Sequence, residues 1–232
     1  LRRALEKSIN VISIRIADTI GIDMVMNYYA RLLKMNDEEK KTRIPRNLSI
    51  ALGSIEVSPY ELTRAYAILA NGGRDVIPFA IRNIKNRKGE IIENKEAEIN
   101  SILEEKRQKG TIQIVKPETA QVIISMMRSV ISSGTARAAS LGRPVGGKTG
   151  TTNNWKDAWF IGFTANLTTG LWIGYDKLGL SLGIGQAAAG IAAPVWGDYM
   201  REALRNDPVM DFPVYAPLVT IKVCANSGLL PG

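Results

Sequence analysis

The sequence predicts an α+β domain in which an antiparallel sheet is flanked by helices. In most of the first half of the chain, apolar residues recur at steps of three and four, which is typical of helices. Later, short apolar runs are separated by turn residues, which is typical of strands. Helices, then strands, then a final helix favour a mixed α+β arrangement. With 232 residues, 45% of them hydrophobic, the chain can bury one large core.

The first two helices are predicted from apolar spacing. One stripe marks helical structure at the start of the chain and consists of Leu5, Ile9, Ile12, Ile16 and Ile20. Gly21 is expected to end it, and Asp23 to cap a second helix that runs to about Lys34. The inward residues of this second helix are Met26, Tyr29, Leu32 and Leu33. The charged stretch Met35–Asn47 is predicted to be a surface loop.

Two further helices have clear start signals. In Ser58-Pro59-Tyr60-Glu61, serine can cap, proline suits the first helical position, and glutamate can reach back to the cap. This helix is predicted to run to Ala70 and to stop at Asn71-Gly72-Gly73. The second starts at Lys116-Pro117-Glu118 and runs to about Ile131.

A hairpin and an insertion are predicted between these helices. The hairpin pairs Val76–Ile84 with Glu90–Ile92 around a turn at Arg87-Lys88-Gly89. Residues 93–113 begin as a charge-rich stretch without an apolar pattern, so we expect an exposed insertion there.

The last part of the chain is predicted to hold the main sheet and a closing helix. Trp159–Thr164 and Leu171–Tyr175 flank turn residues at Asn166–Gly170, which predicts a second hairpin. Pro194 is expected to start a final helix that ends near Leu204, because proline is favoured at the first helical position.

The chain divides into a main domain of residues 1–207 and a C-terminal extension of residues 208–232, where Leu218–Val223 has a β-like pattern. No apolar run approaches the roughly 20 residues that a membrane span needs. The chain shows no signal peptide and begins at Leu1, so we expect it to be an internal part of something longer.

Composition excludes several kinds of chemistry. The formal charge is +8, but the basic residues are scattered, so a solvated surface is preferred and no nucleic-acid partner is predicted. The chain has no histidine, which excludes Ser-His-Asp and Cys-His catalysis. Cys224 is the single cysteine, expected to be a buried or bystander thiol, so no internal disulfide and no zinc site are predicted. Neither a cofactor nor another metal is predicted.

The run Gly142–Thr149 has two interpretations. Its letters fit G-x-x-x-x-G-K-T, the formula of a nucleotide-binding P-loop, which follows a buried strand and opens a helix. However, Thr135–Ser140 is not a run of branched apolar residues, and Gly150–Asn154 is a poor helix start. Pro144 would also remove a backbone donor that a phosphate needs. These features argue against the nucleotide interpretation.

The second interpretation makes Lys148-Thr149-Gly150 a K-T-G element on an edge strand. Side chains alternate along a strand, so Lys148 and Gly150 should share one face. Thr149 and Thr151 should then share the other. Glycine lets a ligand approach the backbone closely, and hydroxyls beside a lysine can bind a carboxylate through charge-assisted hydrogen bonds.

The flanks of this element follow one family pattern. The matching segments are Ser133-Gly134-Thr135, Gly142–Val145, Gly147–Asn153, Asp157–Thr164, Trp172–Asp176, Ala187–Ala189 and Ala193–Trp196. Near the start, Ser8-Ile9-Asn10 fits an S-x-N element, and Gly53–Pro59 fits the helix entry that follows it. Together they resemble the transpeptidase domain of class A penicillin-binding proteins, the bifunctional peptidoglycan synthases. One departure is Ala165, where that family usually has proline.

This resemblance implies a penicillin-recognising serine transferase fold, also called β-lactamase-like, truncated at its N-terminus. It implies a peptidoglycan D,D-transpeptidase that cross-links stem peptides through a serine acyl-enzyme at D-Ala-D-Ala and is inhibited by β-lactams. The implied catalytic residues are Ser8 as a proton relay, Asn10 as a ligand of the substrate amide, and Lys148 as the electropositive group. The implied substrate-binding residues are Thr149, Gly150, Thr151 and Thr152, with the Thr151 N–H as half of an oxyanion hole.

The attacking serine of such an enzyme belongs to an S-x-x-K element, and no lysine of this chain has a serine three positions before it. The resemblance implies that this serine, a membrane anchor and a glycosyltransferase domain precede Leu1, so the fragment alone is expected to be inactive. The implied partners are stem peptides, the lipid-linked precursor, β-lactams and the missing N-terminal portion. The implied location is the extracytoplasmic face of the bacterial inner membrane. A non-catalytic β-lactam sensor or scaffold and, less favoured, a P-loop nucleotide binder remain as alternatives.

Overall fold

The computed structural model describes residues 1–177, 179–219, 221–224 and 227–230. The helices are α1 (Arg2–Glu6), α2 (Asn10–Ile20), α3 (Ile22–Leu33), α4 (Asp37–Arg43), α5 (Pro59–Ala70), α6 (Lys95–Gln108), α7 (Pro117–Ser132) and α8 (Ala188–Ala203). The strands are β1 (Asn83–Lys85), β2 (Ile91–Asn94), β3 (Gly146–Thr151), β4 (Asp157–Phe163) and β5 (Thr168–Gly174). Helices and antiparallel sheets confirm the predicted α+β class.

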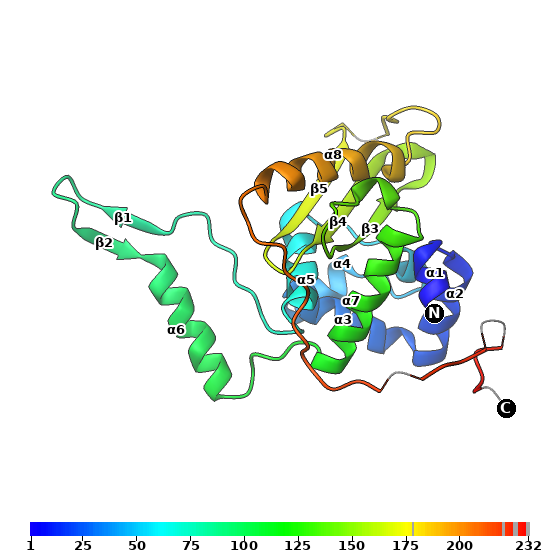
Figure 1. The fold of residues 1–232 in the computed structure, drawn as a ribbon, viewed down its shortest axis with the longest axis horizontal. Coiled ribbons are helices and arrows are strands. Elements are labelled where there is room, and N and C mark those ends of the chain that lie inside the picture. The colour runs from blue at the N-terminus through cyan, green and yellow to red at the C-terminus, as the bar shows by residue number, and fades with distance from the viewer. Residues whose placement is uncertain (178, 220, 225–226, 231–232) are drawn as a thin grey trace.

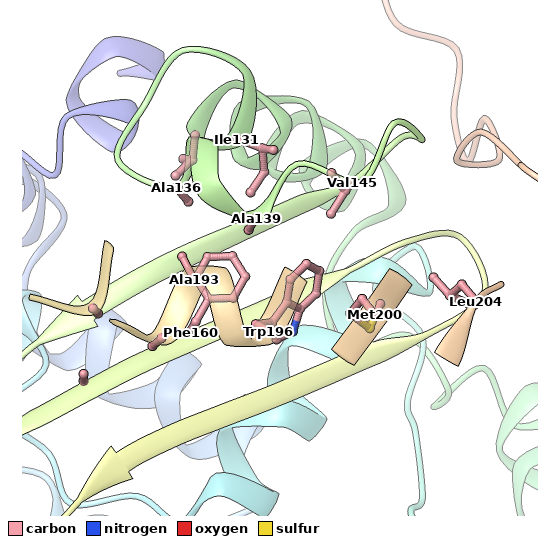
Figure 2. Close-up of a cluster of buried hydrophobic side chains, with 13 residues drawn as sticks. Ile131, Ala136, Ala139, Val145, Phe160, Ala193, Trp196, Met200 and Leu204 are labelled. Atoms are coloured by element: carbon pink, nitrogen blue, oxygen red, sulfur yellow. The ribbon is translucent and has the colours of Figure 1, made fainter. Parts of the chain in front are cut away.

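The main sheet is antiparallel with the strand order β3-β4-β5. Helix α8 lies on one face of it, and α5 and α7 cover the other, which gives three layers (Figure 1). Figure 2 shows the core between α8 and the sheet, where Trp196 lies beside Phe160 with ring centroids 4.8 Å apart. Both rings are almost completely buried, and area removed from water in this way is the dominant favourable contribution to folding.

The predicted helical stripe near the start of the chain is broken. Helix α1 ends at Glu6 and α2 begins at Asn10, with Ser8 between them at a φ of 53°. A left-handed residue cannot continue the regular helical hydrogen bonds, so the direction of the chain changes there. The stripe is also less buried than its spacing suggests, because Ile16 and Ile20 are exposed and only Ala17 of α2 is buried.

Helix α3 confirms the second predicted helix, with Met26 and Leu33 buried, but Asp23 does not cap it. Gly21 is the N-cap residue, and the carboxylate of Asp23 pairs instead with the guanidinium of Arg46. The loop predicted at Met35–Asn47 is wrong as well, since helix α4 occupies most of it.

Helix α4 forms through features that a search for apolar periodicity misses. Asn36 and Glu39 make a capping box, in which each side chain accepts from the other residue's backbone N–H. Acidic residues fill the first turn and basic residues the last turn, which complements the helix dipole. Local capping and charge placement therefore form a short helix with no buried residue of its own.

The start signal at Ser58 is confirmed by α5. Ser58 and Glu61 make a capping box, and Pro59 occupies the first helical position. Helix α7 likewise begins at Pro117 and ends at Ser132, close to the predicted bounds.

The predicted first hairpin is present, but it is short and stands away from the main body together with α6 (Figure 1). Strand β1 starts only at Asn83, so Val76–Ile81 is not strand. The charge-rich stretch that follows is helical, and in α6 only Ile99 is buried. That residues 93–113 form an insertion stays a prediction.

The second hairpin is confirmed by β4 and β5, but the predicted start of the last helix is wrong. Helix α8 begins at Ala188, and Pro194 lies inside it. A proline there removes one intrahelical hydrogen bond, which normally disfavours the position. The helix persists because its inward face, which includes Trp196 and Met200, is buried against the sheet.

The chain beyond α8 packs back on the main body. The Tyr215 hydroxyl donates to the backbone oxygen of Ala70 over 2.7 Å, and Gln121 of α7 accepts from the Tyr215 N–H. The domain boundary after residue 207 stays a prediction. The described residues of Leu218–Val223 are not in a strand, and Thr220 lies outside the described residues. Cys224 is exposed, so it is not a buried thiol.

Candidate active site

Strand β3 carries the K-T-G residues along the edge of the main sheet, as the described residues define it. A side chain at Gly146 would contact α7, so this face of β3 looks toward α7. Residues two and four positions later, Lys148 and Gly150, share that face. Thr149 and Thr151 lie on the opposite one. The predicted strand and the alternation of its residues are therefore present.

Lys148 and Ser8 are in contact although they are 140 residues apart. The Lys148 ammonium donates to Ser8 Oγ over 3.0 Å and to its neighbour's backbone oxygen, Thr149 O, over 2.9 Å. Burial lowers the pKa of Lys148 below its usual 10.5, because desolvation disfavours the charged form. A lysine of lowered pKa that is bonded to a hydroxyl can take up or return a proton at that hydroxyl.

The hydroxyls of the two strand threonines are each held by one contact. Thr149 Oγ1 lies 3.0 Å from Thr135 Oγ1, in the turn after α7. Thr151 Oγ1 accepts from the Ala188 N–H, at the start of α8, over 3.0 Å. A lysine and two threonine hydroxyls therefore lie along one edge strand, and groups of these kinds can bind a carboxylate through charge-assisted hydrogen bonds.

Thr152 is held within the protein. Its hydroxyl donates to Asp157 Oδ2 over 3.0 Å and accepts from the Asp157 N–H over 2.8 Å. Asp157 also accepts from the Trp172 indole over 2.9 Å, which ties the end of β3 to β4 and β5. Asp157 thus uses the donor hydrogen and one acceptor position of the Thr152 hydroxyl, and the role of Thr152 in binding substrate stays a prediction.

Asn10 is the first residue of α2 and is exposed. Within the described residues its side chain makes no hydrogen bond, so it is near Ser8 in sequence but is not joined to Lys148 by a contact. Its role as a ligand of the substrate amide also stays a prediction.

Three groups hold the site residues in place: Thr135 and the N–H of Ala188, which were not predicted from the sequence, and Asp157, which the sequence indicates as structural and not catalytic. All three lie in segments that match the family pattern. The sequence signal for Thr135 is its place in the matched segment Ser133-Gly134-Thr135, whereas only the structure shows that a Cβ at Gly134 would come within 2.6 Å of the backbone oxygen of Glu6. In the described part of the chain, no group of three His, Cys, Asp or Glu residues could hold a metal ion.

Comparison with known proteins gives matches over most of the chain. The family model "Penicillin binding protein transpeptidase domain" matches residues 1–195. Penicillin-binding protein 1A of Aquifex aeolicus is 38% identical over 213 residues, which is 91% of this chain and 27% of the relative. Penicillin-binding protein 1A of Rickettsia typhi is 36% identical over 240 residues, which is 98% of this chain and 30% of the relative. The chain thus spans under a third of the length of these curated relatives.

Solved structures share the fold. The crystal structure of penicillin-binding protein 1A from Haemophilus influenzae superposes with a TM-score of 0.83 at 29% identity, covering 100% of this chain and 38% of that one. PonA1 from Mycobacterium tuberculosis, in complex with penicillin V, superposes with a TM-score of 0.76 at 22% identity. The match covers 92% of this chain and 58% of the PonA1 chain. The second likeness concerns the fold alone.

Proposed function

This chain belongs to the penicillin-binding protein transpeptidase family, and from that premise we propose that it forms the substrate-binding side of a serine D,D-transpeptidase site. The substrate would be the D-Ala-D-Ala end of a peptidoglycan stem peptide. The observation that carries the proposal is the contact of Lys148 with Ser8 beside the held hydroxyls of Thr149 and Thr151.

The reaction proceeds in two steps. A serine Oγ attacks the carbonyl carbon between the two D-alanines, the C–N bond breaks, and D-alanine leaves as an amine. The proton released by the serine reaches this leaving amine through Ser8, whose Oγ is bonded to Lys148. An amine of a second stem peptide then attacks the ester carbon. The new amide forms, a proton leaves the attacking amine, and the serine is regenerated.

The residues of this chain bind and polarise the substrate. Thr149 and Thr151 donate to its terminal carboxylate, and the Lys148 ammonium keeps the site positive. The Thr151 N–H, on an edge strand, supplies half of the oxyanion hole, where charge develops during attack. The attacking serine is part of an S-x-x-K element, which this chain does not contain. We therefore propose that a different segment of the natural protein supplies it and that the 232-residue chain by itself is not acylated.

Labelling with a fluorescent penicillin tests this proposal on the full-length natural protein. We expect a covalent label that survives denaturing electrophoresis. Lys148→Ala should slow labelling about a hundredfold, since transition-state donors contribute on that order. The matched control is Lys156→Ala, at an exposed lysine, which should label at the wild-type rate. If intact protein takes up no label at all, the proposal is wrong.

A second candidate, a β-lactam sensor or scaffold without turnover, shares the pocket and would also be labelled. Cross-linking of a D-Ala-D-Ala donor peptide to an amine acceptor by the full-length protein distinguishes the two, since a sensor would release no D-alanine. The P-loop alternative is not favoured, because Lys148 lies in the middle of a strand instead of at a helix start.

We further propose that the natural protein is anchored at the extracytoplasmic face of the inner membrane and also carries glycosyltransferase activity on the lipid-linked precursor. This rests on the resemblance to class A penicillin-binding proteins, the bifunctional peptidoglycan synthases. In the described residues, no helix combines the length and apolar character that a membrane crossing requires. Fusion of a β-lactamase reporter to the C-terminus tests the location: ampicillin resistance is expected, and sensitivity would contradict it.

A further inference from the structure

The turn that follows α7 contacts both halves of the site. The Lys7 ammonium donates to Ser133 O over 3.0 Å, and the Thr135 N–H donates to Glu6 O over 3.1 Å. Gly134, between them, has no room for a side chain, because a Cβ would lie 2.6 Å from Glu6 O. The turn is therefore packed directly on the end of α1, two residues before Ser8.

These contacts close a ring. Covalent bonds lead from Glu6 through Lys7 to Ser8, whose Oγ accepts from Lys148. Lys148 is bonded to Thr149, whose hydroxyl contacts Thr135, and the Thr135 N–H returns to Glu6. Thr135 thus joins the α1 end to the K-T-G strand a second time, beside the contact that Ser8 makes with Lys148.

The direction of the hydroxyl hydrogen bonds also matters. A carboxylate only accepts, so each strand threonine must keep its own proton for it. At Thr151 this is guaranteed, because the Ala188 N–H can only donate to the hydroxyl oxygen. At Thr149 the partner is another hydroxyl, and either of the two can donate. Thr149 has its proton available only when Thr135 is the donor.

We propose that Thr135 is a positioning residue for the transpeptidase site: its hydroxyl donates to Thr149 Oγ1 and so directs the Thr149 proton toward the substrate carboxylate. This rests on the proposed function of the K-T-G strand. Thr135 does for Thr149 what the Ala188 N–H does for Thr151. It does not touch the substrate itself.

The test compares Thr135→Val, which keeps the shape but lacks the hydroxyl, with Thr135→Ser, which keeps the hydroxyl, in the full-length protein. The second-order acylation rate is measured with a penicillin and with the methyl ester of the same penicillin. We expect Thr135→Val to slow acylation by the free acid about fivefold to tenfold, the usual worth of one hydrogen bond, and to leave the ester unchanged. Thr135→Ser should restore the rate with the free acid.

The matched control is Thr169→Val. Thr169 is also half-buried and its hydroxyl also has one side-chain partner, Met200 Sδ, but it lies on β5, away from the K-T-G strand. It should alter neither rate. The proposal would be overturned if Thr135→Val reduced the acylation rate equally for the free acid and the ester, or reduced neither rate. If Thr135→Val does not fold, Thr135→Ala replaces it, and failure of both to fold would assign Thr135 a structural role and overturn the proposal too.

A measurement of binding affinity, which does not depend on acylation, distinguishes this proposal from the proposed function. Calorimetry gives the affinity for an acyl-D-Ala-D-Ala peptide and for its C-terminal amide. If Thr135→Val binds the peptide acid more weakly than wild type does but binds the amide equally well, the positioning role is supported. This holds even if wild-type protein is never acylated by penicillin. Unchanged affinity for the acid would contradict that role even if acylation occurs.

Discussion

At the scale of single residues, Ser8 combines an unfavourable backbone with a polar contact. Its φ of 53° lies in the left-handed region, which costs an L-residue about 1–2 kcal/mol relative to ordinary helical backbone. In this conformation Ser8 Oγ lies 3.0 Å from the ammonium nitrogen of Lys148. Strain of this kind persists where the surrounding structure determines the conformation, here the packing of α1 against α7.

Comparison of Ser8→Gly with Ser8→Ala isolates this strain, because both variants lose the hydroxyl. Glycine adopts positive φ without penalty, so Ser8→Gly should be more stable than Ser8→Ala by about 1 kcal/mol. Urea unfolding of the two variants measures the difference. Equal stability, or a more stable alanine variant, would mean that Ser8 is not strained. Both should be labelled slowly by penicillin.

The lowered pKa of Lys148 predicts a dependence of stability on pH. The unfolded lysine keeps its proton up to about pH 10.5, whereas burial makes the folded one release it at lower pH. Between the two pKa values the unfolded state binds more protons, so the free energy of unfolding contributed by Lys148 rises with pH. Lys148→Met should lack this rise, and Lys156→Met, at an exposed position, should retain it. The free energy of unfolding is measured at several pH values approaching about 10.5. If it changes with pH in the same way in wild type and in Lys148→Met, the predicted contribution of Lys148 is absent.

At the scale of elements, the turn after α7 and the first turn of α8 differ in the space around their glycines. At Gly134 a Cβ would meet backbone atoms of Glu6 and Val130 at 2.6–2.7 Å, and backbone cannot give way as a flexible side chain can. At Gly190 a Cβ would meet nothing within 4 Å, and the residue is helical. Position within the fold therefore decides whether a glycine is needed.

The same substitution should have opposite effects at these two glycines. Gly134→Ala should destabilise the protein by about 2 kcal/mol or more, through the steric clash. Gly190→Ala should stabilise α8 by about 0.5–1 kcal/mol, because alanine is the better helix former. Thermal unfolding of both variants checks the pair, and a stable Gly134→Ala variant would show that the turn can move away from α1.

At the scale of the whole molecule, a buried carboxylate joins three distant helices. Asp75, which is 4% exposed, pairs with Arg64 of α5 and with Lys106 of α6. Arg64 also donates to Leu32 O at the end of α3 over 2.8 Å. Burial alone would raise the pKa of Asp75, but the hydrogen bond from Lys106 and the charges of Arg64 and Lys106 outweigh it and lower the pKa below 3.8. This cluster fastens the base of the protruding hairpin and α6 to the body.

Asp75→Asn should destabilise the protein by about 3–5 kcal/mol, because it leaves a buried arginine without its counter-charge. A carboxyl group with a lowered folded pKa stabilises the fold above its unfolded pKa of about 3.9, and this contribution is lost as the pH falls through the folded value. The stability gap between wild type and variant should therefore narrow in acid below about pH 4. The control Asp23→Asn breaks an ion pair in which both side chains are well exposed and should change stability by less than about 1 kcal/mol. Urea unfolding at neutral and acidic pH provides the measurement. A difference in free energy of unfolding between wild type and Asp75→Asn that does not change with pH would contradict the lowered pKa of Asp75.

Much of the fold was predictable because its signals are local. The Ser58 capping box, the proline at the start of α7 and the strand through Lys148-Thr149-Gly150 each depend on residues within one or two turns of chain, so spacing alone indicates them. The K-T-G and S-x-N elements likewise indicated that Lys148 and Ser8 belong to one site, and they are in hydrogen-bond contact.

The sequence by itself thus determined the α+β class, the family and the pair of elements that meet at the site. Only the tertiary structure decided where the first helix breaks, why α8 runs through Pro194, and that Thr135 holds Thr149. The physical reason is that each of these depends on partners far away in the chain. The strain at Ser8 is offset by packing on α7, the missing hydrogen bond at Pro194 by burial against the sheet, and a hydroxyl finds its acceptor only once two distant segments have folded together.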